Sequence, residues 1–208
     1  MTTSSELLDL SPVMPVVVLD DADVAPDVAR ALLAGGIGAI ELTLRTPAAL
    51  AAIENVATQV PDIVVGAGTV ITPDQARQAA DAGAGFLVTP GSTEPLLDAV
   101  TATGLPFLPG VATVSEAMRL AERGLDTLKF FPAEANGGPA ALKAFGGPLP
   151  NLTFCPTGGI TVANAPDYLA LSNVGCVGGT WLTPKDAVAS GDFATIERLA
   201  KEAAVLGG

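Results

Sequence analysis

The chain has 208 residues, of which 49% are hydrophobic, and it carries a formal net charge of -12. This length and composition suit one globular domain with its own core, and they exclude an intrinsically disordered segment. The acidic balance opposes broad contact with nucleic-acid phosphates or anionic membranes, so we expect neither partner. One small anion can still be held locally, because backbone N–H groups bind phosphate without any net positive charge.

The residue types that the sequence lacks limit the kinds of catalytic and metal site that it can form. The sequence contains no histidine, which excludes Ser-His-Asp triads and histidine-based zinc sites. No apolar run reaches the roughly 20 residues that a bilayer span needs, and Met1–Leu10 lacks the pattern of a secretory signal. We therefore expect a cytoplasmic protein in which Cys155 and Cys176 are small, reduced core residues.

An apolar strand followed by an Ala-rich amphipathic helix recurs about every 20–27 residues along the chain, a repeat-like spacing. Continuous apolar runs are typical of a parallel sheet that is covered on both faces. The expected strands lie at residues 15–19, 39–42, 63–66, 86–89, 107–109, 127–130, 153–156 and 174–177. The expected helices lie at residues 23–34, 47–59, 73–82, 94–103, 114–123, 138–145, 163–170 and 193–205.

Several helix boundaries carry clear signals. Thr72 is an expected N-cap, because Pro73 follows it at the first helical position. Thr113 or Ser115 caps the helix that ends before Gly124, which stands at the position after the C-cap. The recurrence of helix, glycine and new strand indicates a succession of βαβ units.

Eight strand–helix units predict an α/β fold, a compact (β/α)8 TIM barrel that occupies residues 1–208 as one domain. Residues 1–12 are expected to form an N-terminal extension with a short helix. The alternative is an open doubly wound sheet, which would need a G-x-G-x-x-G turn after the first strand. The segment there is Asp20-Asp21-Ala22-Asp23, so the barrel is favoured.

Lys129 is the candidate nucleophile, because catalytic groups of TIM barrels lie at the C-terminal ends of strands. It interrupts an apolar strand, and a lysine amine that loses hydration has a lowered pKa and becomes nucleophilic. A buried structural ion pair is the other interpretation, and it is compatible with a nucleophilic role. By contrast, Lys143 and Lys201 lie on expected helices and Lys185 lies in an expected polar loop, so all three are interpreted as solvated.

Glu41 is the expected acid–base partner of Lys129, since it ends the second strand and a carboxylate there would enter the barrel interior. Period-2 alternation places Glu41 and Thr43 on one face, and Arg45 joins them if the extended run continues. A structural ion pair with Arg45 or Lys129 is the alternative role for Glu41. The Arg45 guanidinium offers a planar fork that suits a carboxylate.

Glycine-rich turns end three of the expected strands. Thr69 follows Gly66-Ala67-Gly68 and adds a hydroxyl, although such a turn alone is weak support for a site. More informative are Gly158-Gly159 after the seventh strand and Gly178-Gly179 after the eighth. TIM barrels commonly build phosphate sites from these two loops, and paired glycines let N–H groups approach the oxygens closely. A phosphorylated keto acid fits all of these features.

The chain closely resembles the 2-keto-3-deoxy-6-phosphogluconate aldolases, which are often bifunctional with 4-hydroxy-2-oxoglutarate aldolase. The resemblance extends from about Pro15 to Ala204 and rests on six segments that occur in order. These segments are residues 41–46 (ELTLRT), 66–70 (GAGTV), 89–91 (TPG), 129–134 (KFFPAE), 155–160 (CPTGGI) and 178–182 (GGTWL).

The resemblance implies a class I lyase that cleaves 2-dehydro-3-deoxy-6-phosphogluconate to pyruvate and glyceraldehyde 3-phosphate, and 4-hydroxy-2-oxoglutarate to pyruvate and glyoxylate. It implies that Lys129 forms the Schiff base and that Glu41 moves protons. It also implies a homotrimer that uses no metal and no cofactor.

The resemblance also assigns the substrate contacts. Arg45 and Thr69 would bind the keto-acid carboxylate, Pro90 and Phe131 would shape that pocket, and Thr157 would meet the substrate hydroxyls. The phosphate group would be held by Gly158, Gly159, Gly178, Gly179 and Thr180. Members of the family often have serine in place of Thr180, so the extra methyl group bears on phosphate binding and substrate preference.

Two other functions share parts of this pattern. A phosphate-binding barrel isomerase would use the glycine loops without an amine nucleophile. A non-catalytic phosphosugar sensor would be stabilised by its ligand but would turn nothing over. Trapping pyruvate on Lys129 and measuring pyruvate release separate both alternatives from the aldolase.

Overall fold

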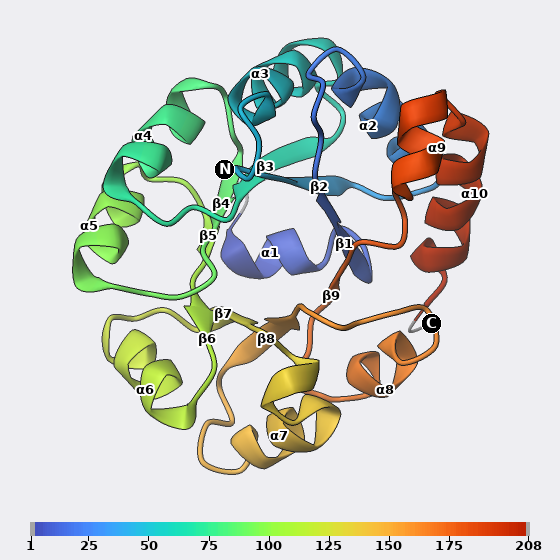
Figure 1. The fold of residues 1–208 in the computed structure, drawn as a ribbon. Coiled ribbons are helices and arrows are strands. Elements are labelled where there is room, and N and C mark those ends of the chain that lie inside the picture. Colours follow the sequence, from blue (N-terminus) through green and yellow to red (C-terminus); the bar gives the residue numbers. More distant parts are fainter. Residues whose placement is uncertain (1–2, 207–208) are drawn as a thin grey trace.

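The computed structural model describes residues 3–206, in which parallel strands form a closed barrel surrounded by helices (Figure 1). Each paired strand runs parallel to its neighbours, as a succession of βαβ units requires. The strands are β1 (Val13–Val17), β2 (Ala39–Thr43), β3 (Val64–Gly68), β4 (Phe86–Val88), β5 (Phe107–Leu108), β6 (Gly110–Val111), β7 (Thr127–Phe130), β8 (Thr153–Pro156) and β9 (Val177–Gly179).

The barrel consists of two arcs of strands that meet at two seams. One arc has the order β5-β4-β3-β2-β1-β9 and the other the order β6-β7-β8. At the first seam β5 and β6 are two halves of one barrel strand, which is interrupted at Pro109. The Pro109 carbonyl still accepts a hydrogen bond from the Lys129 amide. At the second seam single bridges join Phe154 to Val174 and Thr157 to Gly178. The sheet is therefore closed, as the sequence predicts.

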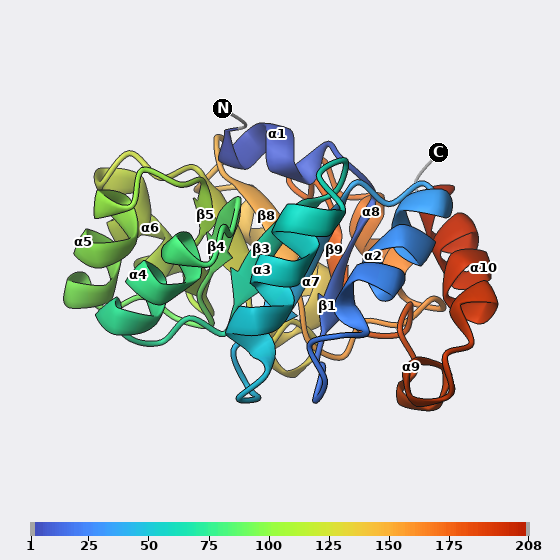
Figure 2. The same ribbon diagram turned by 90° about the horizontal axis from the view of Figure 1, so that it is seen from above.

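Helices cover the outside of the barrel, and α1 (Ser4–Leu8) closes one end of it (Figure 2). Leu7 and Leu8 of this helix are buried against the barrel interior, and the Ser4 hydroxyl donates to the carbonyl of Phe107 at the start of β5. The N-terminal ends of the strands are thus capped, which leaves the C-terminal ends for a site. The outer helices are α2 (Ala25–Ala34), α3 (Ala49–Gln59), α4 (Pro73–Asp81), α5 (Glu94–Ala102), α6 (Val114–Glu122), α7 (Gly138–Phe145), α8 (Ala165–Leu169), α9 (Lys185–Ser190) and α10 (Phe193–Ala204), with a short 3-10 helix at Glu134–Asn136.

The helix boundary signals are confirmed. The Thr72 hydroxyl accepts from the amide of Gln75, and Thr113 rather than Ser115 caps α6 in a reciprocal pair with Glu116. Gly124 follows α6 in the left-handed region with φ of 79°. The expected N-terminal helix is also present, with Met1 and Thr2 outside the described residues. Among residues 3–206, none of the helices combines the length and the apolar character that a membrane crossing needs.

Three local predictions were wrong. Lys185 does not lie in a polar loop, because residues 185–190 form α9, a helix too short to show a clear apolar period. The last strand begins at Val177 rather than Val174, because the chain bends at Gly175, where a Cβ would crowd Leu8 of α1 at 2.9 Å. The first strand starts two residues earlier than expected and includes Pro15 in its interior.

Glycines inside the barrel make room for larger side chains from neighbouring strands. A Cβ added to Gly66 would overlap the ring of Phe86, and one added to Gly68 would overlap the carboxylate of Glu41. Both glycines are on β3, between the strands that carry these side chains. The interior is close-packed, so small residues on one strand determine which bulky or charged groups the next strands can place there.

We expect Gly66→Ala to lower the free energy of unfolding by about 1–3 kcal/mol, because overpacking of a filled core forces neighbours out of place. Urea denaturation followed by circular dichroism measures the change. Gly91→Ala is the matched control, since its Cβ would meet nothing within 4 Å, and its stability should be unchanged or slightly higher. Equal stability of the two variants would contradict this account of the interior.

Candidate active site

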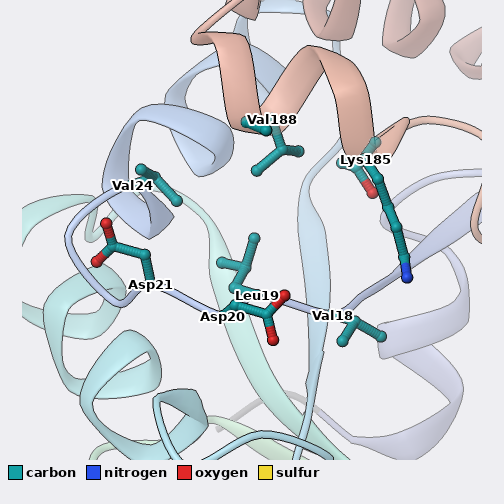
Figure 3. A pocket seen from close by; sticks show the side chains of 9 residues that line it. Val18, Leu19, Asp20, Asp21, Val24, Lys185 and Val188 are labelled. Carbon is teal, nitrogen blue, oxygen red and sulfur yellow. The ribbon is translucent and has the colours of Figure 1, made fainter.

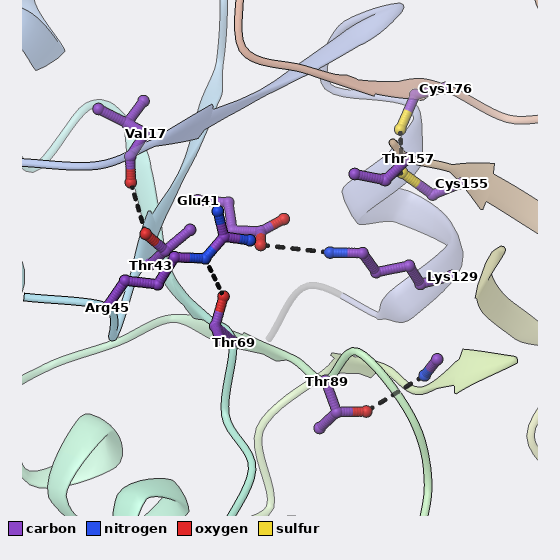
Figure 4. A network of polar contacts seen from close by, with 11 residues as sticks. Val17, Glu41, Thr43, Arg45, Thr69, Thr89, Lys129, Cys155, Thr157 and Cys176 are labelled. Atoms are coloured by element: carbon purple, nitrogen blue, oxygen red, sulfur yellow. Dashed lines mark hydrogen bonds and ion pairs between the residues drawn. The ribbon is translucent and has the colours of Figure 1, made fainter. Parts of the chain in front are cut away.

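Glu41 and Lys129 form an ion pair inside the barrel. Glu41 extends from β2 and Lys129 from β7, and Lys129 Nζ lies 3.4 Å from Glu41 Oε1 (Figure 4). Their side chains are only 3% and 5% exposed, respectively. The predicted juxtaposition of amine and carboxylate is therefore present, and the ion-pair interpretation of both residues is also correct.

Packing fixes each member of this pair. Glu41 passes over Gly68 of the adjacent strand, where any side chain would displace its carboxylate. Lys129 Nζ lies 5.4 Å from the centre of the Phe131 ring, a cation–π contact. Removing one partner of a buried charge pair leaves the charge of the other without a counter-ion, which is strongly destabilising. The two side chains therefore depend on each other to remain buried.

Arg45 reaches the site from a turn rather than from the strand. β2 ends at Thr43, so the extended run does not continue to Arg45, and the Arg45 amide instead donates to the carbonyl of Thr43. The Arg45 guanidinium is exposed and donates through Nε to the Thr69 hydroxyl at 3.1 Å. Thr69 has a φ of 57°, a left-handed conformation that is unfavourable for a β-branched residue. Such strain often accompanies functional sites.

A cavity of about 230 Å³ lies at the C-terminal ends of β1, β8 and β9 and contains most of the predicted contact residues. Arg45 contributes to its lining, together with residues from the turns after β8 and β9. A small phosphorylated acid is the kind of ligand that such a mixed apolar and polar cavity can hold. The lining residues are Val16, Arg45, Phe131, Thr157, Gly158, Gly159, Ile160, Gly178 and Thr180.

The glycines around this cavity have distinct structural reasons. Gly158 and Gly159 have φ of 103° and 80°, conformations that residues with a side chain rarely adopt. Gly178 is required because a Cβ there would overlap the Thr157 hydroxyl. Gly179 is absent from the lining, and a Cβ on it would overlap the ring of Trp181.

Pro90 and Thr69 do not line the cavity, although the Thr69 hydroxyl accepts from Arg45, which does line it. The backbone of Pro90 presses so closely on Gly110 of β6 that a Cβ on that glycine would overlap it. Thr89 supports the same place, since its buried hydroxyl accepts from the Gly110 amide at 3.2 Å (Figure 4). Pro90 is thus held at the seam next to β7, the strand that carries Lys129.

The two thiols lie in the barrel interior, in the hydrophobic cluster that also contains Leu7 and Leu8 of α1. Cys155 and Cys176 are buried and free, their sulfur atoms lie 3.5 Å apart, and Cys155 Sγ lies 4.0 Å from the Thr157 hydroxyl. The hydrogen bond to Cys155 and burial raise the pKa of the Cys176 thiol. Cys176 therefore stays protonated, and both cysteines are small, buried core residues, as predicted.

Val16 and Ile160 line the cavity but carry no chemical signal in the sequence, because both are aliphatic. The alternation of side chains along β1 is the one clue to Val16. It places Val16 on the same face of the strand as Met14, which packs in the hydrophobic cluster inside the barrel. Among the described residues, no three Asp, Glu or Cys side chains cluster as they would to hold a metal ion.

A second and larger hollow, of about 340 Å³, lies between the segment after β1 and α9 (Figure 3). Its charged lining residues are Asp20, Asp21 and Lys185, and valines and Leu19 supply much of the rest. Lys185 is exposed at the start of α9, so its amine is solvated in the ordinary way. The smaller cavity is the better candidate site, because it is the one that borders Arg45, Phe131 and Thr157.

Comparison with known proteins points to one family. The family model described as KDPG and KHG aldolase matches residues 5–199. A 2-dehydro-3-deoxy-phosphogluconate aldolase from Dickeya dadantii is 52% identical over 97% of this chain and 95% of its own length. A KHG/KDPG aldolase from Escherichia coli is 50% identical over the same shares of the two chains.

Solved structures agree with the sequence relatives. The KDPG aldolase of Legionella pneumophila, with pyruvate captured as a covalent carbinolamine intermediate, superposes with a TM-score of 0.95 at 44% identity over 98% of both chains. The Zymomonas mobilis enzyme with 3-phosphoglycerate gives a TM-score of 0.93 at 45% identity, covering 99% of this chain and 97% of its own. The family model and these relatives span nearly the whole chain, which therefore belongs to the KDPG and KHG aldolase family.

Proposed function

We propose that the protein is a class I aldolase that cleaves 2-dehydro-3-deoxy-6-phosphogluconate to pyruvate and glyceraldehyde 3-phosphate. The same site is proposed to cleave 4-hydroxy-2-oxoglutarate to pyruvate and glyoxylate. The observation that carries the proposal is the buried Lys129 amine, held 3.4 Å from the Glu41 carboxylate beside a cavity of suitable size. The carbinolamine in the Legionella relative supports this chemistry.

The proposed reaction begins when Glu41 takes a proton from the Lys129 ammonium, and the neutral amine then attacks the keto carbon of the substrate. Glu41 returns this proton to the carbinolamine hydroxyl, which leaves as water, and the resulting iminium ion draws electrons from the C3–C4 bond. Glu41 accepts the proton of the C4 hydroxyl as that bond breaks, which gives an enamine and releases the aldehyde. Glu41 returns a proton to the enamine, and water then releases pyruvate and restores the amine.

The proposed substrate contacts are those that the family resemblance implies, and the residues that line the cavity support several of them. Arg45 and Thr69 are proposed to hold the keto-acid carboxylate, next to Phe131 and Pro90. The hydroxyl of Thr157 is proposed to meet the substrate hydroxyls. The N–H groups of the turns at residues 158–159 and 178–180 are proposed to hold the phosphate, as 3-phosphoglycerate binding by the Zymomonas relative suggests.

We also propose that residues 1–208 act as one domain, in a cytoplasmic homotrimer. The support is the family resemblance, and sedimentation equilibrium of the purified protein is the test. A mass equal to three chains is expected, and a stable monomer at micromolar concentration would overturn the proposal.

We expect borohydride with pyruvate to inactivate the protein and to leave a reduced pyruvate adduct on Lys129, located by peptide mass spectrometry. Lys129→Arg should give neither adduct nor pyruvate release, because a guanidinium stays protonated and cannot form the imine. Lys143→Arg is the matched control, since Lys143 is exposed on α7, and it should behave like the unaltered protein. Turnover in Lys129→Arg, or no adduct at saturating pyruvate, would exclude the proposed nucleophile.

We expect Glu41→Gln to lower kcat for pyruvate release by roughly 10²–10⁴-fold, the usual contribution of a positioned acid–base group. Glutamine keeps the shape above Gly68 but cannot accept the C4 hydroxyl proton. A coupled assay for pyruvate measures the effect, with Glu54→Gln on the exposed face of α3 as the control. A kcat near that of the control would assign proton transfer to another group.

A further inference from the structure

Glu134 and Tyr168 contact each other behind the glycine turn at residues 158–159, and neither lines the cavity. Tyr168 lies on α8, is fully buried, and donates a hydrogen bond from its hydroxyl to Oε1 of Glu134. Burial and the adjacent Glu134 carboxylate raise the pKa of Tyr168. The hydroxyl therefore remains a hydrogen-bond donor at neutral pH.

Glu134 in turn packs directly on the glycine turn. Its amide donates to the carbonyl of Gly158 at 3.1 Å, and a Cβ on Gly159 would lie 2.6 Å from Cγ of Glu134. The Gly159 carbonyl accepts from Nδ2 of Asn164 at 3.2 Å. The turn is consequently held from its outer side, while its inner side borders the cavity.

Glycine permits the left-handed conformations of this turn but does not enforce them, because it has more conformational freedom than any other residue. Contacts from outside the turn must therefore supply its rigidity. Phosphate binding by backbone N–H groups depends on their direction, so a turn that samples other conformations binds the anion more weakly.

We propose that Glu134 and Tyr168 are positioning residues that hold the turn at residues 158–159 in its phosphate-binding conformation. This inference rests on the proposed function, because it assigns the phosphate end of the substrate to that turn. Glu134 also lies five positions after Lys129 on the segment that follows β7. The segment that carries the proposed nucleophile thus also supports the proposed phosphate turn.

A positioning role and a merely structural one predict different results. Loss of the contact should weaken phosphate recognition and leave the chemistry on a ligand without phosphate unchanged. A structural role would lower thermal stability, or would change the kinetics of phosphorylated and unphosphorylated substrates equally.

The test uses Tyr168→Phe, which removes only the hydroxyl, and Glu134→Ala, which removes the packing against Gly159. In both, we expect the Kd for 3-phosphoglycerate and the KM for 2-dehydro-3-deoxy-6-phosphogluconate to rise about 3- to 10-fold. The KM for 4-hydroxy-2-oxoglutarate and the rate of borohydride trapping with pyruvate should stay as they are. Glu134→Gln keeps both the packing and an acceptor oxygen, so it should restore most of the phosphate affinity.

Glu122→Ala is the matched control, since Glu122 is an exposed carboxylate on α6, and it should change none of these quantities. Unchanged 3-phosphoglycerate affinity in Tyr168→Phe and Glu134→Ala, or equal changes with both substrates, would overturn the inference. Failure of the proposed function is distinguishable, because it appears in the unaltered protein as no pyruvate release and no adduct on Lys129. Calorimetry with 3-phosphoglycerate decides the positioning role even then, and absence of binding to the unaltered protein counts against it.

Discussion

The ion pair between Glu41 and Lys129 is the interaction on which the rest of the site depends. Two charged groups removed from water are stable only when they lie close to each other. Burial of this pair therefore requires β2, which carries Glu41, and β7, which carries Lys129, to face one another across a narrow interior. The same closeness suits proton exchange during imine chemistry. The ion-pair interpretation of Lys129 is therefore confirmed, and it is compatible with the proposed role of this lysine as the nucleophile.

Glycines on neighbouring strands leave the space that the polar side chains of the barrel interior occupy. Gly68 leaves the volume that the Glu41 carboxylate occupies, and Gly178 leaves the volume that the Thr157 hydroxyl occupies. Because a barrel interior of this size is filled completely, each functional side chain needs a neighbouring strand that gives way to it. The glycines on strands thus make room for neighbouring side chains. Gly158 and Gly159, by contrast, lie in a turn and adopt positive φ angles that other residues rarely adopt.

The sequence predicted the barrel and the central residues because their signals are local. A lysine within an apolar strand, a glutamate at a strand end and paired glycines after two strands can each be recognised within a few residues. Features that depend on tertiary contacts could not be predicted. The bend at Gly175 depends on α1, the turn at Arg45 depends on where β2 stops pairing, and the hydrogen bond of Tyr168 depends on a partner 34 positions away. Aliphatic lining residues such as Val16 carry no chemical signal of their own.

The two seams of the sheet have a mechanical consequence. Glu41 belongs to the arc of β5-β4-β3-β2-β1-β9, whereas Lys129 belongs to the arc of β6-β7-β8. Between the arcs the ladder is interrupted at Pro109 on one side and reduced to single bridges on the other. A small rigid-body rotation of one arc against the other would change the gap between acid and amine while leaving the hydrogen bonds within each arc intact. The distance between the carboxylate and the amine therefore depends on how the two arcs are placed relative to each other.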